Sequence, residues 1–350
     1  MRAAIEAATL GLSSGGLARY TAELSLALAR CFPDDEFFLI SNQPFRMPPA
    51  CPPNLKRGGG PRNAMERRWW LWGIARELGR IGADLIHGPD FAVPYIPRLP
   101  SVLTLHDLSP WMDPSWHFAA QRVARRTPVL LELGIATMAL THSEAVRKQA
   151  IERFGLRPER VVAAPAAAAP WLHPVETAPR TPYFLFLGTL EPRKNLPALV
   201  DAWRAVRRRH PIDLVLAGRR RADCPPIPEE PGLHMPGGVQ DGDLSGLYSG
   251  ALAFVYPSFY EGFGLPVLEA MQCGACVIAS RAVAETGGDA AAYADSVEDL
   301  TRAMLRAVEE PAWRAERRAR GLARAREFSW ERTARITREV YEEARKRFGG

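Results

Sequence analysis

The chain has 350 residues, of which 47% are hydrophobic and 24% are charged. This length corresponds to about two domains, and the composition excludes an intrinsically disordered chain. The best apolar run, residues 129–140, is interrupted by Glu132 and is shorter than the ~18 residues of a membrane span. The five cysteines are sparse and odd in number, which argues against a disulfide scaffold. Since no signal-peptide pattern is visible, we expect a cytoplasmic protein.

The net charge of +6 is unevenly distributed along the chain. Residues 1–175 carry 20 basic and 15 acidic side chains, whereas residues 176–350 carry 25 and 24. The excess in the first half would attract an anionic substrate or lipid headgroups, and it leaves open a peripheral contact with the inner membrane. No basic stripe with interleaved aromatic residues and no known module is present, so we expect no nucleic-acid partner.

In chain order, the first half alternates short apolar runs with amphipathic stretches, the pattern of a parallel-sheet α/β protein. Helical spacing of Leu17, Tyr20, Leu24 and Leu28 predicts a first helix. The tryptophan-rich segment that begins at Arg67 favours a buried helix over a membrane-surface helix, because Trp69 and Trp70 point in different directions. We predict strands at 2–7, 37–41, 85–87, 101–105 and 139–141, and further helices at 67–80 and 144–154.

The second half repeats this alternation after an Ala- and Pro-rich stretch at 163–182, which is the best candidate for an interdomain linker. We predict strands at 183–187, 213–217, 251–256 and 275–279, helices at 196–209 and 266–273, and exposed helices from Pro311 onward. The predicted organisation is a first domain at 1–165, a linker at 166–182, a second domain at 183–330 and a helix at 331–350. Whether that last helix packs back on the first domain stays open. Two doubly wound parallel-sheet domains predict a cleft at their junction, facing the carboxyl ends of both sheets.

Several familiar motifs are absent or weak. No lysine precedes Ser or Thr, which excludes a Walker loop, and Gly262-Phe-Gly264 lacks the third glycine of a dinucleotide fingerprint. Gly11-Leu-Ser13-Ser-Gly15 matches a nucleophile elbow, but a flexible turn before a helix is the favoured interpretation. Cys273 and Cys276 have no second cysteine pair and are interpreted as buried apolar residues. Asp243 is interpreted as a helix N-cap rather than a metal ligand. No metal site is predicted.

Two other segments indicate a binding site more specifically than these motifs do. In the first, Arg193 and Lys194 stand together between a strand and a helix, with Asn195 as a candidate cap. A guanidinium fork, an ammonium group and a helix dipole suit a diphosphate. In the second, Glu261-Gly-Phe-Gly-Leu-Pro-Val-Leu-Glu269, glycines permit close backbone approach and Pro266 favours a helix start. Carboxylates on the loop and in the first turn suit sugar hydroxyls. Together the two segments predict a nucleotide-sugar site.

These segments resemble the retaining nucleotide-sugar glycosyltransferases of family four, which have the two-domain GT-B fold. The resemblance extends over most of the chain, in GGLARYTAEL, LIHGP, LTLHDLSP, THSEAV, YFLFLGTLEPRKNLPALV, LVLAGR, LYSGALAFVYPSFYEGFGLPVLEAM and FSWERTAR, and is closest to mannosyltransferase-like members. Two segments depart from the family pattern: Pro165–Ala169 lacks its polar residues, and Arg281–Gly288 is shorter.

The resemblance implies a role for each matched residue. Arg193 and Lys194 would bind the donor diphosphate, and Glu269 would hold the ribose hydroxyls. Glu261 would contact the transferred sugar with help from the backbone at Gly264 and Leu265. From the first domain, His106 would contact the sugar near its reacting carbon, and Gly15 and Gly16 would let their loop approach the donor.

The expected reaction is transfer of a hexose with retention of configuration and without a cofactor or an obligatory metal. The best candidate is mannose from GDP-mannose, passed to a glycan or lipid-linked acceptor in cell-surface polysaccharide synthesis. A UDP-hexose donor, a non-catalytic nucleotide-sugar-binding protein and a Ser13 hydrolase remain as alternatives.

Overall fold

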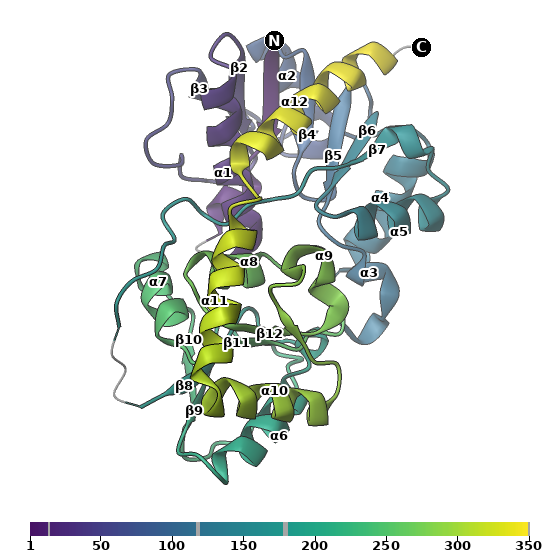
Figure 1. Cartoon of the computed structure of the whole chain (residues 1–350). Helices are drawn as coiled ribbons and strands as arrows, with labels where there is room; N and C mark the ends of the chain where they lie inside the picture. Colours follow the sequence, from purple (N-terminus) through teal and green to yellow (C-terminus); the bar gives the residue numbers. More distant parts are fainter. Residues whose placement is uncertain (13–14, 117–119, 178–180, 349–350) are drawn as a thin grey trace. The chain divides into compact units, whose positions relative to one another are not determined.

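The computed structural model describes residues 1–12, 15–116, 120–177 and 181–348 (Figure 1). The chain divides into two compact units. The first comprises Met1–Met112, Ala119–Ala166 and Ser329–Gly350, and the second comprises Asp113–Phe118 and Ala167–Phe328. Both ends of the sequence therefore belong to the first unit, and a short piece of the first half belongs to the second. Ser13 of the possible nucleophile elbow lies outside the described residues.

The first unit is built on a parallel sheet. Its seven strands, counted over the described residues, follow the order β3-β2-β1-β4-β5-β6-β7. Because β1 has β2 on one side and β4 on the other, the direction of winding reverses between β1 and β4. The strand bounds are β1 Arg2–Glu6, β2 Glu36–Ile40, β3 Leu55–Arg57, β4 Leu85–Gly88, β5 Ser101–Leu105, β6 Met138–Thr141 and β7 Val161–Ala163.

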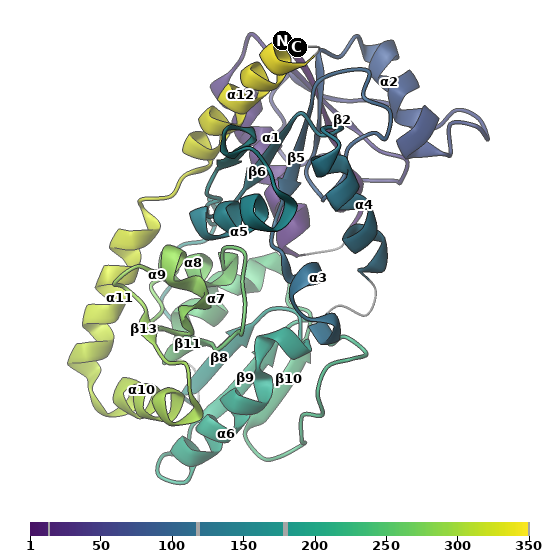
Figure 2. The same ribbon diagram turned by 90° about the vertical axis from the view of Figure 1, so that its right-hand side faces the viewer.

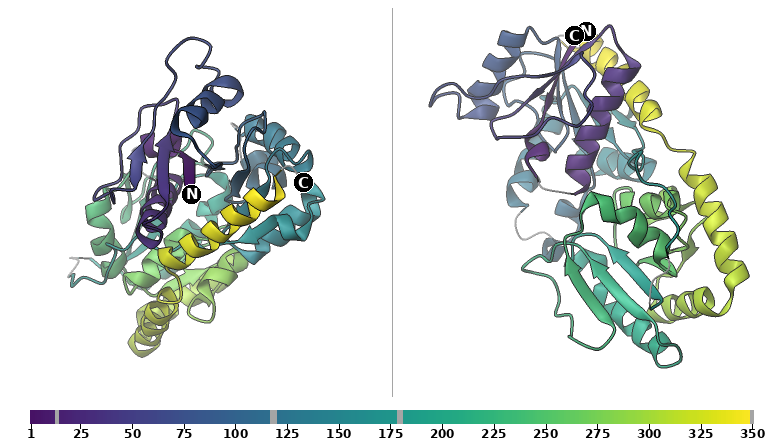
Figure 3. Two further views of the ribbon diagram at one scale, coloured as in Figure 1. Left: turned by 90° about the horizontal axis from the view of Figure 1, so that it is seen from above. Right: turned by 90° about the vertical axis from the view of Figure 1, so that its left-hand side faces the viewer.

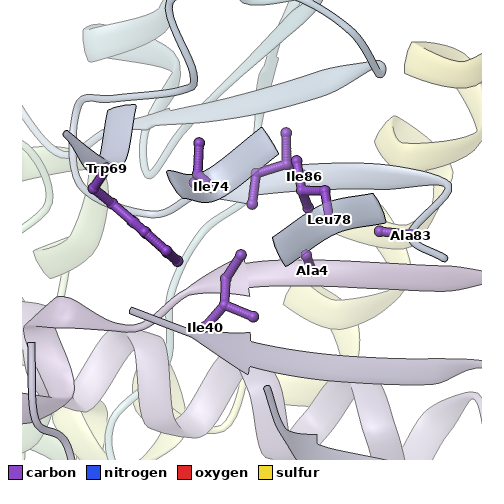
Figure 4. Close-up of a cluster of buried hydrophobic side chains, with 7 residues drawn as sticks. All are labelled: Ala4, Ile40, Trp69, Ile74, Leu78, Ala83 and Ile86. Atoms are coloured by element: carbon purple, nitrogen blue, oxygen red, sulfur yellow. The ribbon is translucent and has the colours of Figure 1, made fainter. Parts of the chain in front are cut away.

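Alternation along the strands assigns side chains to the two faces of this sheet. On one face, Ala4 of β1, Ile40 of β2 and Ile86 of β4 pack against Trp69, Ile74 and other apolar residues of η2 and α2 (Figure 4). On the other face, helices α1 and α12 lie side by side, as Figures 1 and 3 show. The helices of this unit are η1 Ala8–Gly11, α1 Gly16–Cys31, η2 Trp69–Gly73, α2 Ile74–Ile81, α3 Ser109–Met112, α4 Gln121–Glu132, α5 Glu144–Phe154, η4 Pro158–Arg160 and α12 Trp330–Arg347.

The second unit contains a second parallel sheet. Its six strands, again counted over the described residues, follow the order β10-β9-β8-β11-β12-β13, so the winding reverses between β8 and β11. The strand bounds are β8 Tyr183–Leu187, β9 Asp213–Ala217, β10 Leu233–Gly237, β11 Ala253–Tyr256, β12 Val277–Ala279 and β13 Ala292–Tyr293.

The helices of the second unit cover this sheet in adjacent pairs. Helix α6 packs beside α10, and α8 packs beside α11 (Figure 2). The apolar stripe of α6 predicted from the sequence is buried, with Leu199 and Trp203 fully enclosed. The helices are η3 Pro114–Trp116, η5 Pro192–Lys194, α6 Leu196–Arg207, α7 Asp241–Gly250, α8 Leu265–Gln272, η6 Arg281–Val283, α9 Ala284–Gly287, α10 Val297–Glu309 and α11 Pro311–Ala325.

Some local predictions were wrong or incomplete. Short strands β3, β7, β10 and β13 and the longer helices α4 and α10 were not predicted. The tail after Pro311 is not simply exposed, because Trp313, Trp330 and Tyr341 are buried. Helix α11 has one aromatic residue and α12 has two, and the many arginines and glutamates around them hid the buried face.

The Ala-rich stretch after β7 is buried rather than extended in solvent. Ala166 and Ala169 have no exposed surface, because their small side chains let the backbone pack closely. The Thr333 side chain of α12 donates a hydrogen bond of 2.5 Å to the Pro165 carbonyl within the first unit. None of the helices in the described ranges is both long and apolar enough to cross a membrane.

Candidate active site

The strongest candidate site lies where the winding of the second sheet reverses. The loop after β8 carries Arg193 and Lys194, and the loop after β11 carries Glu261 and Gly264. Strands β8 and β11 are hydrogen-bonded neighbours, so their carboxyl ends bring the two loops together. Ligands of open α/β sheets bind at this kind of reversal point. The topology therefore joins the two segments that the sequence singled out separately.

The loop after β8 turns tightly before α6 begins. Pro192–Lys194 forms a single 3₁₀ turn, η5, and Asn195 adopts a left-handed conformation with φ of 52°. Asn195 occupies the N-cap position of α6, but its side chain makes no capping hydrogen bond, so the predicted capping role was wrong. The turn orients the cations, which are both buried in this unit.

Arg193 and Lys194 converge on one carboxylate. Lys194 Nζ lies 2.5 Å from Glu261 Oε1, and Arg193 Nη1 lies 3.2 Å from Glu261 Oε2. Lys194 also donates a 2.7 Å hydrogen bond to the Tyr256 hydroxyl, and Arg193 donates one of 2.7 Å to the Tyr260 carbonyl. The side chains of all three charged residues are less than 10% exposed. Sequence spacing gave no sign that the two predicted groups would pair directly.

A second carboxylate completes the cluster from the side of η5. Glu191 accepts hydrogen bonds from Arg193 through Oε1, and its Oε2 lies 2.5 Å from Arg221 Nη1. Arg221 in turn donates a 2.6 Å hydrogen bond to the Trp116 carbonyl, and the Trp116 ring stacks on Tyr260. Trp116, from the first half of the sequence, thus supports the site of the second unit.

Burial and charge together set the ionisation of this cluster. Burial alone would raise the pKa of Glu261, but Arg193 and Lys194 outweigh it and hold that pKa at about 2. Burial lowers the pKa of Lys194, and the neighbouring Arg193 lowers it further, while Glu261 and Glu191 oppose the change. Glu261 is therefore a carboxylate over the whole physiological range. A buried ammonium group whose pKa is lowered by burial favours a strongly anionic ligand, because such a ligand stabilises its charged form.

The loop after β11 leads into α8 through Gly264, which has φ of 90°. A side chain there would be strained, and its Cβ would lie 2.6 Å from Val283 Cγ1. Helix α8 starts at Leu265 with Pro266 in its first turn, which presents its first backbone amides at the loop. Glu269 is 1% exposed and accepts a 3.0 Å hydrogen bond from Tyr248. It lies in the second turn of α8, not in the first as predicted.

The remaining predicted residues lie in the first unit. His106 follows β5, and both of its ring nitrogens have partners: Nε2 donates to the Pro89 carbonyl at 2.5 Å, and Nδ1 lies 2.8 Å from His142 Nε2. Burial lowers the pKa of His106. Gly15 is the N-cap of α1 with φ of 122°, and Gly16 begins the helix; both are exposed.

Two further motifs resolve into structural roles. Cys273 and Cys276 are buried, and burial raises the pKa of each thiol to about 12, which confirms the apolar interpretation. Helix α7 begins at Asp241 with Gln240 as its N-cap, so the prediction of Asp243 as the cap was wrong. Within the described ranges, no three His, Cys, Asp or Glu side chains form a group that could hold a metal ion.

Sequence reasoning missed Glu191, Arg221 and Trp116 as members of the site. Glu191 lies two residues before Arg193, and this proximity in a loop after a strand was the available signal. Arg221 follows β9, the strand next to β8, so its loop also ends at the carboxyl edge. Trp116 comes from the other half of the sequence, and no local pattern indicated its place.

Comparison with known proteins agrees with this geometry. Residues 181–310 match the family model described as glycosyl transferases group 1, and residues 14–167 match the model described as Glycosyltransferase Family 4. The chain is 36% identical over 286 residues to the O-antigen chain mannosyltransferase B of Escherichia coli, which covers 73% of this chain and 74% of the relative. It is 30% identical over 239 residues to the MMP alpha-(1->4)-mannosyltransferase of Mycolicibacterium hassiacum, covering 64% of this chain and 56% of that one.

Solved structures share the architecture at low sequence identity. Sucrose-phosphate synthase from Thermosynechococcus elongatus superposes with a TM-score of 0.74 at 19% identity, covering 98% of both chains. Anabaena Alr3699/HepE, in a complex with UDP and glucose, gives a TM-score of 0.68 at 17% identity over 97% of this chain and 99% of that one. With two parallel-sheet units and matches to both family models, the chain belongs to glycosyltransferase family 4 and is a glycosyltransferase with the GT-B fold.

Proposed function

We propose that this enzyme transfers mannose from GDP-mannose, with retention of anomeric configuration, to a glycan or lipid-linked acceptor in cell-surface polysaccharide synthesis. The sugar and the pathway are supported by the relatives named as mannosyltransferases, above all the O-antigen chain enzyme at 36% identity. The chemistry is supported by the buried cluster of Arg193, Lys194 and Glu261, which is the observation that carries the proposal.

The cluster suits a diphosphate leaving group. When the bond between the anomeric carbon and the phosphate oxygen breaks, its electron pair stays on the diphosphate. Arg193, Lys194 and the first amides of α8 would hold that charge in place, in a buried site where fixed cations act more strongly than in water. The acceptor hydroxyl forms the new bond to the same carbon, and its proton passes to the departing diphosphate oxygen, which lies on the same face of the sugar when configuration is retained. Stabilisation by these cations supports a reaction with no obligatory metal.

Before the donor binds, Glu261 and Glu191 neutralise the two cations. Diphosphate oxygens would compete with Glu261 for Lys194 Nζ and Arg193 Nη1. A displaced Glu261 carboxylate would then accept hydrogen bonds from hydroxyls of the transferred sugar. We propose that the other residues have the roles that the family resemblance implies: Glu269 holds the ribose, and Gly264 and Leu265 bind the donor through their backbone. Gly15 and Gly16 let their loop approach the donor, and His106 contacts the sugar near its reacting carbon.

The role proposed for His106 is restricted by its hydrogen bonds. Both ring nitrogens are already paired within the first unit, with Pro89 and His142. His106 would contact the sugar through its ring edge, or through Nδ1 after the bond to His142 is exchanged. The Pro89 bond requires a proton on Nε2, so Nδ1 is the acceptor of the neutral ring.

Replacing Lys194 tests the donor site. Lys194→Ala should lower the rate of mannosyl transfer from GDP-mannose by about 100-fold, since it removes one of the charges that stabilise the leaving group. Lys148→Ala is the matched control, because Lys148 is exposed on α5 of the first unit. Unchanged transfer and unchanged GDP affinity in Lys194→Ala would refute the assignment.

A thermal-shift screen over GDP- and UDP-sugars separates the donors. GDP-mannose should raise the melting temperature most, and a larger rise with a UDP-hexose would replace it as the donor. NMR of the product made from the preferred donor reports the anomeric configuration, and EDTA should leave the rate unchanged. Donor binding without any transfer or hydrolysis would indicate a non-catalytic binding protein.

A further inference from the structure

The winding of the first sheet also reverses, between β1 and β4. The charged residues at this reversal point are acidic, whereas Arg193 and Lys194 at the reversal point of the second sheet are basic. Glu6 is the last residue of β1, and Asp90 follows β4 by two residues. Whereas the second sheet places Arg193 and Lys194 at this position, the first places two acids. The two units share a topology, but their reversal points are built for different chemistry.

Glu6 is a buried acid with unused hydrogen-bonding capacity. Ala4 of the same strand packs against the cluster that contains Trp69 and Ile74 (Figure 4). Glu6 lies two positions after Ala4, so the alternation of a strand places its side chain on the same face. Glu6 is 3% exposed, and its Oε2 accepts a 3.1 Å hydrogen bond from the Ala8 amide. Its Oε1 is buried and has no hydrogen-bond partner. A buried carboxylate oxygen without a partner is costly, and it indicates that a hydrogen-bonding group is missing.

Arg126 of α4 supplies the complementary donor. Its Nε is also buried without a hydrogen-bond partner, and its guanidinium group lies over the half-buried Trp70 ring at 5.6 Å. Nη2 reaches the Phe91 carbonyl at 3.4 Å, beside Asp90. Asp90 is half-buried, and among the described residues its carboxylate makes no hydrogen bond or ion pair. One region of the first unit therefore holds an unpaired acceptor, an unpaired donor and an acid that reaches the surface.

This set of groups selects a neutral polyhydroxyl ligand. A hydroxyl group both donates and accepts, so one or two neighbouring hydroxyls can satisfy a carboxylate and a guanidinium Nε together. Two carboxylates facing a single arginine repel a phosphate or another carboxylate. The residues at this reversal point therefore do not contribute to the net positive charge of the first half of the sequence. The charge at this position therefore disfavours a phosphate, in contrast to the diphosphate site proposed for the second unit.

We propose that Asp90 and Arg126, with Glu6 beneath them, form a subsite for the hydroxyls of a carbohydrate acceptor at the reversal point of the first sheet. This inference rests on the proposed glycosyl transfer for the identity of its ligand. Asp90 and Arg126 contact the acceptor. Glu6 accepts a hydrogen bond from a hydroxyl of the acceptor, either directly or through an intervening group.

The ionisation of Glu6 gives the subsite a pH signature. Burial raises the pKa of Glu6 to about 7, and the like charge of Asp90 adds to this, while the Ala8 amide, the Ser41 hydroxyl and Arg126 oppose it. A carboxylate accepts a stronger hydrogen bond than a carboxylic acid. Acceptor binding should therefore strengthen as the pH rises from 6 to 8, and the Glu6→Gln variant should lose this dependence.

The test measures acceptor and donor separately on the full-length protein. The probes are the methyl α-glycosides of mannose, glucose and galactose, whose binding is followed by saturation-transfer NMR without donor and whose transfer is followed with GDP-mannose. Asp90→Asn and Arg126→Gln should each raise the KM of the preferred glycoside about tenfold or more and leave the GDP affinity within twofold. Glu6→Gln should flatten the pH profile of that KM. Inorganic phosphate should not compete.

Glu159→Gln is the matched control, since Glu159 is exposed on η4 just before β7, at the amino edge of the same sheet. The subsite is refuted if no methyl glycoside binds the wild type, or if Asp90→Asn and Arg126→Gln bind the glycoside as well as Glu159→Gln does. Competition by phosphate would also refute it. Failure of the proposed donor reaction looks different: GDP-mannose would not bind or react, while glycoside binding and its loss in the variants would persist.

Discussion

The Tyr341 hydroxyl lies 2.7 Å from Nδ1 of His87, a hydrogen bond between residues 254 positions apart in the sequence. Tyr341 is on α12 and His87 is on β4, and both are fully buried. Nε2 of His87 lies 2.8 Å from Thr104 Oγ1, which also pairs with the Tyr20 hydroxyl of α1. The last helix is thus bonded into the polar interior of the first unit.

Removal of the Tyr341 hydroxyl should destabilise the first unit without touching the donor site. In Tyr341→Phe, His87 Nδ1 keeps its burial but loses its partner, which costs about 1–3 kcal/mol of unfolding free energy. Urea denaturation measures this cost, and Tyr95→Phe, at a half-buried tyrosine of the same unit, is the matched control. An equal, small effect of both substitutions would show that the bond contributes little.

Buried neutral histidines should make the protein sensitive to acid. Burial lowers the pKa of His87 to about 3, and it also lowers the pKa values of His106 and His142. Since these groups take up protons near pH 6.5 only when unfolded, stability should fall as the pH drops below 6.5. His87 contributes a slope of about 1.4 kcal/mol per pH unit, and the lowered pKa values of His106 and His142 act in the same direction. Glu6, with its raised pKa, opposes them by one proton.

The slope can be measured from urea midpoints at pH 7, 6 and 5. His87→Gln keeps a hydrogen-bond donor and an acceptor but cannot take up a proton. The slope of its unfolding free energy against pH should therefore be smaller than that of the wild type by the contribution of about one proton. His173→Gln, at an exposed histidine, should not change the slope. A steeper slope in His87→Gln would contradict the burial argument.

Apolar periodicity predicted the central elements of both sheets because these strands are long enough to show it. The predicted strands at 101–105, 183–187 and 213–217 match β5, β8 and β9 to the residue. Edge strands β3 and β13 have three and two residues and carry no usable pattern. Helix α4 was missed because Pro128 stands inside it and three arginines mask its apolar face. The place of α12 depends on contacts across the whole chain, which local pattern cannot supply.

The donor-side residues were predictable because their chemistry is concentrated in two short segments. Arg193, Lys194 and Glu261 came from those segments, and the parallel pairing of β8 with β11 explains why they meet. The direct pairing of cations with Glu261 was not predictable, since it depends on side-chain directions after two turns. Glu6 and Asp90 each stand alone in the sequence, and only the strand order brings them to one point.

The lowered pKa of Lys194 should appear as an alkaline limit on nucleotide binding. A diphosphate prefers the charged ammonium group, so GDP affinity should fall as the pH rises through a pKa that burial has moved below the usual 10.5. Calorimetry of GDP binding between pH 7 and 10 measures this fall. Lys194→Arg, which stays charged, should bind GDP with no such pH dependence. A wild-type affinity that is constant up to pH 10 would show that Lys194 does not sense the diphosphate.

The cysteines should divide into reactive and protected groups. Cys31 and Cys51 are half-buried, whereas Cys273 and Cys276 are buried with thiol pKa values raised to about 12, and only the thiolate reacts. A native variant with Cys31, Cys51 and Cys224 changed to Ser should therefore react very slowly with a disulfide reagent at pH 8, and it should release two equivalents after denaturation in guanidinium. Zinc added to this variant should neither bind nor change the rate, because the pair has no further ligands among the described residues. Rapid labelling of the native variant would instead indicate that the end of α8 opens readily, and tight zinc binding would contradict the structural interpretation of the pair.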